Sequence, residues 1–144
     1  MLNIQKTITL DIDEIKIHHW VETVLINRNK QNSEITLRFV DIVEIQQLNH
    51  TYRNKNQPTN VLSFPSDLPS EIKSNFLGDI VICNEVVIKE AKQQQKTNEA
   101  HFAHMIIHGV LHLLGFDHIK EAEAEEMENL EIELLKQLNF QNPY

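Results

Sequence analysis

The chain has few residues that cross-link proteins covalently or interrupt regular structure. It contains one cysteine, Cys83, with three glycines and four prolines among 144 residues. A single cysteine excludes an internal disulfide framework. No apolar run is long enough to span a bilayer, and residues 1–13 alternate polar and apolar side chains, unlike a signal peptide. We therefore expect a cytoplasmic protein with no membrane contact.

Basic residues are also scarce, and the formal net charge is −8 at pH 7. The first 60 residues carry seven basic and seven acidic side chains, whereas residues 61–144 carry six basic and fourteen acidic ones. A protein that grips nucleic acid through its overall charge presents a basic surface. This composition therefore disfavours a general nucleic-acid binder, and we expect any contact with RNA to be local and to involve the neutral half.

Length and side-chain patterns predict one α+β domain over residues 1–144, with a small mixed β-sheet flanked by helices. Hydrophobic residues make up 41% of the chain, which is enough for a core. Alternating apolar residues predict strands over 2–10 and 35–39. A short strand over 61–64, which Pro65 ends, is expected at a sheet edge, and the apolar run over 78–83 predicts a buried strand. Apolar residues three or four apart predict helices over about 14–27, 42–52, 85–96, 98–114 and from 119 onward. Residues suited to cap these helices are Asp13, Asp41 and either Thr97 or Asn98.

Histidines are concentrated in one stretch, where five of the eight lie between residues 101 and 118. Residues 108–118 have the pattern H-x-x-x-H-x-x-G-x-x-H. Side chains four apart on an α-helix project from one face about one turn apart, so His108 and His112 can bind one ion. Gly115 can adopt the left-handed conformation that ends a helix, which lets the chain fold back and bring in His118. The pattern predicts a metal site on a central helix and the turn after it, with these three histidines as ligands.

Three neutral imidazoles without a carboxylate favour one zinc ion per chain, with nickel or copper as substitutes. Three protein ligands leave a fourth position open, as in catalytic zinc sites, and water held there can ionise near neutral pH. Asp117 could orient that water or a ligand, or could stabilise the turn, and both readings are open. His101 and His104 lie on the same helical stripe and are assigned supporting or structural roles.

The histidine spacing is similar to that of the metzincin proteases, H-E-x-x-H-x-x-G-x-x-H. The glutamate that acts as general base in those proteases is replaced here by Gly109. Glycine cannot accept a proton from water. A metzincin-like metallohydrolase is therefore a disfavoured alternative, although the metal geometry can be shared.

The form H-G-x-L-H-L-x-G-x-D-H resembles the YbeY family of bacterial endoribonucleases that mature ribosomal RNA. Other segments match that family in the same order, so the resemblance covers nearly the whole chain. These segments are residues 52–53, 58–65 and 77–80. Asn60 stands where many relatives have aspartate and Phe116 where many have tyrosine, and these departures change nothing central.

The resemblance implies a zinc-dependent, single-strand-specific endoribonuclease that acts in 16S rRNA 3′-end maturation and ribosome quality control. It implies that Arg53, by itself an ordinary loop arginine, faces the metal cleft, where a guanidinium can hold a phosphate and stabilise developing charge. Ribosomal RNA would be the substrate, with ribosomal proteins or assembly factors as further partners. The alternative is a non-catalytic ribosome-assembly module with a structural metal, because a net charge of −8 suits docking onto basic ribosomal proteins.

Overall fold

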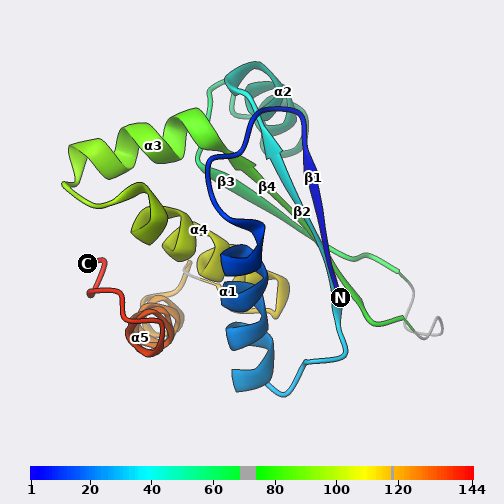
Figure 1. Cartoon of the computed structure of the whole chain (residues 1–144). Helices are drawn as coiled ribbons and strands as arrows, with labels where there is room; N and C mark the ends of the chain where they lie inside the picture. The colour runs from blue at the N-terminus through cyan, green and yellow to red at the C-terminus, as the bar shows by residue number, and fades with distance from the viewer. Residues whose placement is uncertain (69–73, 118) are drawn as a thin grey trace.

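The computed structural model describes residues 1–68, 74–117 and 119–144. Within these ranges the chain forms an α+β domain with a four-stranded mixed sheet and five helices, as predicted (Figure 1). No helix in these ranges is long and apolar enough to cross a membrane. In chain order the elements are β1 (Leu2–Lys6), α1 (Glu14–Asn27), β2 (Glu34–Val40), α2 (Ile42–Arg53), β3 (Val61–Pro65), β4 (Phe76–Cys83), α3 (Asn84–Gln93), α4 (Asn98–Leu113) and α5 (Glu121–Gln137).

The sheet has the strand order β1-β2-β4-β3. β2 pairs in parallel with β1 and β4, and β3 pairs antiparallel with β4. β3 is an edge strand, as predicted, and its last residue is Pro65, which edge strands tolerate because proline lacks an N–H. β1 is shorter than predicted because it runs out of partner residues. Its last residue, Lys6, pairs with Phe39, and β2 ends one residue later at Val40.

Helix starts follow the predicted capping residues. The side chains of Asp13, Asp41 and Thr97 each accept a backbone N–H of the first turn at 2.8–3.1 Å. α3 and α5 begin without a side-chain cap, and α5 begins at Glu121 rather than at Ile119, whose side chain is exposed.

Helix α4 is the centre of the fold. It contacts β3, β4, α1, α3 and α5, and Figure 1 shows these helices on one side of the sheet, with α5 beyond α4. Eleven of its sixteen residues are buried, so its polar side chains need partners from the surrounding elements. Helix α2 covers a smaller apolar cluster, in which Ile45 packs with Leu62 and Val81 of the sheet.

Two glycines allow elements to approach closely. A Cβ atom on Gly109 would lie 2.9 Å from Cγ2 of Ile80 and 3.3 Å from Oγ of Ser63, so α4 rests directly on the sheet. Gly78 in β4 has φ +143°, and a Cβ atom there would lie 2.3 Å from the carbonyl oxygen of Phe64. Both positions are therefore closed to larger residues without rearrangement.

We expect Gly78→Ala to lower the free energy of unfolding by more than about 2 kcal/mol, because the new methyl group collides with backbone as well as straining φ. Gly115→Ala is the matched control, since Gly115 has φ +100° and no atom of the neighbouring described residues lies within 4 Å of its Cβ position. That variant should lose only about 1 kcal/mol from backbone strain. Denaturant unfolding of the metal-free proteins measures both, and equal losses would show that the collision at Gly78 is relieved without cost.

Candidate metal centre

His108 and His112 lie at the end of α4 that opens to solvent, and both side chains are half-buried. Their Nε2 atoms are 3.0 Å apart. Two nitrogen ligands of a tetrahedral zinc ion, each about 2.0–2.1 Å from the metal, lie about 3.3 Å apart. The structure therefore brings this predicted pair together at a separation close to that needed to share one ion.

The helix end at Gly115 has the form that the sequence predicted. The Gly115 N–H donates to the carbonyl of His112, and the Phe116 N–H donates to the carbonyl of Leu111, both at 3.0 Å. With φ +100° at Gly115, these contacts form a Schellman motif, which reverses the chain direction after the helix.

The third predicted ligand, His118, lies outside the described residues. Among the residues that the structure does describe, no three His, Cys, Asp or Glu side chains are grouped to hold a metal ion. The structure thus places two of the three predicted ligands, His108 and His112, and the three-histidine site stays a prediction.

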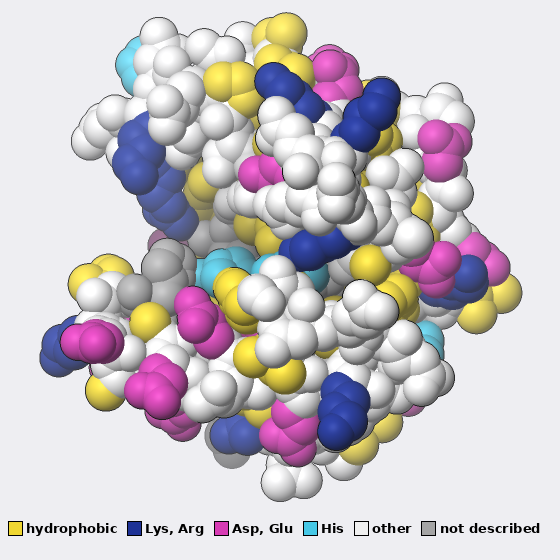
Figure 2. All heavy atoms as spheres, turned by 90° about the vertical axis from the view of Figure 1, so that its left-hand side faces the viewer, with side chains coloured by type: hydrophobic (Ala, Val, Ile, Leu, Met, Phe, Trp, Pro, Cys, Tyr) yellow, Lys and Arg dark blue, Asp and Glu magenta, His cyan; other side chains and the backbone are white. Residues whose placement is uncertain are grey.

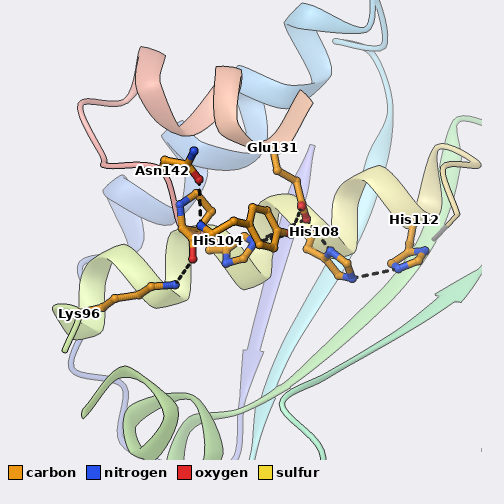
Figure 3. A network of polar contacts seen from close by, with 8 residues as sticks. Lys96, His104, His108, His112, Glu131 and Asn142 are labelled. Atoms are coloured by element: carbon orange, nitrogen blue, oxygen red, sulfur yellow. Dashed lines mark hydrogen bonds and ion pairs between the residues drawn. The ribbon is translucent and has the colours of Figure 1, made fainter. Parts of the chain in front are cut away.

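Glu131 of α5 is fully buried and points at the histidine helix (Figure 3). Its Oε1 lies 2.5 Å from Nδ1 of His108. Burial alone would raise the pKa of Glu131, but the hydrogen bonds from His108 and Tyr144, together with His104 at 3.7 Å, outweigh it and hold the pKa at about 2. The ionised carboxylate accepts the His108 Nδ1–H, so Nε2 is the nitrogen of that ring that could ligate a metal.

Sequence reasoning missed Glu131 because it counted this residue only as one of the fourteen acidic side chains in residues 61–144. A signal was present, since Glu131 lies four residues after Met127 and four before Leu135, both of them buried. That spacing puts the carboxylate on the apolar face of the helix.

Tyr144, also missed, completes this network. Its hydroxyl donates to Oε2 of Glu131 and lies 3.3 Å from Nε2 of His104. Burial and the neighbouring Glu131 raise the pKa of Tyr144 well above its usual range, so the hydroxyl keeps its proton. Lys96 Nζ donates to the carbonyl of Pro143 at 2.9 Å and ties the same segment to the helices.

His101 belongs to a separate pair, near the start of α4. Its Nε2 lies 2.9 Å from Oε1 of Glu90, and Glu90 also accepts from the Asn60 amide at 3.1 Å. Burial lowers the pKa of His101 despite this carboxylate. The pair joins α3, α4 and the start of β3.

A cleft of about 580 Å³ opens beside His108 and His112. Figure 2 shows histidine side chains in a hollow, with lysine and arginine on one side and acidic side chains on the other. The described residues that line the cleft are Asn49, Arg53, Lys55, Gln57, Thr59, Asn60, Val61, Leu62, Ser63, Pro65, His108, His112, Gly115, Phe116 and Asp117.

Arg53 lines this cleft with the two histidines, where the family resemblance placed it. Its Nη2 donates to the Ser63 carbonyl at 2.8 Å, and its guanidinium carbon lies 5.3 Å from the centre of the Phe64 ring. Ser63 Oγ in turn donates to the Gly109 carbonyl at 3.3 Å. Arg53 is thus connected through β3 to the helix that carries the histidines.

Among the described lining residues Asp117 is the only carboxylate. Its Oδ1 accepts the Ile119 N–H at 3.2 Å, which is the contact expected of a turn residue. Gly109, at the position of the metzincin glutamate, packs against Ile80 and Ser63 and leaves no room for a carboxylate there.

Comparison with known proteins identifies the family of this chain. A family model described as endoribonuclease YbeY matches residues 2–139, a range that includes Arg53, His108 and His112. The fold is similar to the solution structure of TM1509 from Thermotoga maritima, with a TM-score of 0.62 and 25% identity over 96% of this chain and 92% of that one. The matched family acts on RNA as an endoribonuclease. The chain therefore belongs to the YbeY endoribonuclease family.

Proposed function

We propose that this protein is a zinc-dependent endoribonuclease that cleaves single-stranded RNA in 16S rRNA 3′-end maturation and in ribosome quality control. The observation that carries the proposal is the convergence of His108 and His112 on the cleft that Arg53 lines. Family membership supplies the endoribonuclease activity, and the chemistry of the cleft supports zinc as the metal.

The residues that would hold zinc are His108, His112 and His118. The first two fit the ion because their Nε2 atoms face each other, and because Glu131 occupies the other nitrogen of His108. When bound, zinc would supply Lewis acidity at a phosphate oxygen and lower the pKa of water.

Arg53 would bind the scissile phosphate and stabilise charge that develops on it. A guanidinium has five N–H donors, and the contacts of Arg53 with the Ser63 and Tyr52 carbonyls use two of them. The remaining donors suit phosphate oxygens. The contact with Ser63 holds the guanidinium in place before the substrate arrives, which reduces the entropy lost on binding.

The distribution of charge supports a local contact with RNA rather than a broad one. Arg53 and Lys55 line the cleft, whereas the chain as a whole carries a net charge of −8. RNA would enter at this basic wall, and the acidic remainder would favour ribosomal proteins or assembly factors as partners in the cytoplasm.

We expect Arg53→Ala to reduce cleavage of a single-stranded RNA by roughly 10²–10³-fold, the usual cost of removing a group that stabilises transition-state charge. Zinc content should stay unchanged, because among the described residues no hydrogen bond joins Arg53 to His108 or His112. Lys55→Ala, which removes the neighbouring cation, is the matched control and should lose much less. A variant that lost zinc along with activity would show instead that Arg53 supports the fold of the site.

We expect His112→Ala to lose bound zinc and RNA cleavage together, because two histidines bind zinc far more weakly than three. His50→Ala, which removes an exposed histidine on α2, should keep both. Metal analysis of the purified proteins and cleavage of a defined single-stranded RNA provide the two readouts. Equal cleavage by His112→Ala and the wild type would separate the reaction from this site.

A further inference from the structure

A buried carboxylate lies directly behind the metal-binding face of α4. Glu131 has no exposed surface, and its Oε1 lies 2.5 Å from Nδ1 of His108. An ionised carboxylate can only accept hydrogen bonds, so this contact requires the proton of His108 on Nδ1. The Nε2 lone pair of the same ring then faces His112 (Figure 3).

Glu131 is itself held by the segment that follows α5. The Tyr144 hydroxyl donates to the second oxygen of the carboxylate, and its ring packs edge-on against His104 with centroids 5.3 Å apart. The Lys96–Pro143 hydrogen bond and a Tyr144 N–H contact to the Asn142 side chain, both at 2.9 Å, hold this segment in place. Both oxygens of Glu131 therefore have fixed donors.

These contacts come from three parts of the chain and meet at the Glu131 carboxylate. A buried anion without donors is costly, so α5 and the 142–144 segment are held against α4 by the same bonds that fix the His108 ring. A carboxylate behind a metal-ligating histidine sets its tautomer and raises its basicity.

We propose that Glu131 and Tyr144 are positioning residues for metal binding at His108. Glu131 sets the orientation and tautomer of the imidazole, and Tyr144 holds Glu131 in place to do so. This inference rests on the proposed metal site, and neither residue touches the RNA.

A second His–Glu pair on α4 serves as a control, because it is expected to stabilise the fold without affecting the metal site. His101 and Glu90 form a similar contact of 2.9 Å on the same helix, but this pair lies away from the two Nε2 atoms. If Glu131 only stabilises the fold, Glu131 and Glu90 variants should behave alike in every measurement.

The experiment compares Glu131→Met, Glu131→Gln, Tyr144→Phe and Glu90→Gln with the wild type. Zinc affinity is measured by competition with a chelator, and stability by thermal unfolding of the metal-free proteins. The His108 tautomer is read from ¹⁵N imidazole shifts of metal-free protein at about pH 8, above the usual pKa of histidine. A His108→Gln sample assigns the signal.

Wild-type His108 should carry its proton on Nδ1. Glu131→Met should lose this preference and bind zinc roughly 10–100-fold more weakly. Glu131→Gln, which keeps an acceptor oxygen, and Tyr144→Phe should show smaller losses of the same kind. Glu90→Gln should lower stability and leave zinc affinity unchanged.

Unchanged zinc affinity and an unchanged tautomer in the Glu131 variants would overturn the inference, as would an equal loss of zinc affinity in Glu90→Gln. If Glu131→Met fails to fold, Glu131→Gln and Tyr144→Phe decide the result. A wild type that binds no zinc would contradict the proposed function, and the His108 tautomer in metal-free protein would then decide the inference alone.

Discussion

Helix α4 is enclosed by apolar surface, and the fold depends on how its histidines are accommodated there. Buried polar side chains need hydrogen-bond partners, and those partners come from the surrounding helices. Glu90 of α3 contacts His101, and Glu131 of α5 contacts His108. These two contacts therefore help to place α3 and α5 around the central helix.

The candidate cleft is a consequence of this arrangement. Glycine at 109 lets α4 lie directly on the sheet, and the turn at Gly115 ends the helix at the cleft. The contacts that connect Arg53 to Ser63, and Ser63 to Gly109, then join the basic wall to the histidines. A rigid scaffold of this kind can hold the proposed phosphate-binding group and the predicted metal ligands in fixed relation before substrate binds.

Local sequence patterns predicted the helices, the edge strand and the capping residues, because each of these depends on neighbours within a few positions. Local patterns could not predict which strands pair, since the order β1-β2-β4-β3 depends on contacts between segments that are distant in the sequence. The over-long first strand has the same origin, because alternation continues to Leu10 after the pairing with β2 has ended.

The candidate site was partly predictable for a similar reason. The spacing of His108 and His112 on one helix is a local property, and the structure brings them together. Glu131 and Tyr144 reach His108 and each other only through tertiary packing. The sequence signal for Glu131 was its position on the apolar face of α5. A count of acidic residues does not reveal that position. Arg53 needed the family resemblance, because an arginine at a helix end has no local signature of phosphate binding.

The most direct test of this account is a crystal structure of the zinc-loaded protein with anomalous scattering at the zinc edge. The account predicts one strong peak about 2.0–2.1 Å from the Nε2 atoms of both His108 and His112, with His118 as the third protein ligand. A peak elsewhere on the molecule, or zinc bound through Nδ1 of His108, would contradict it.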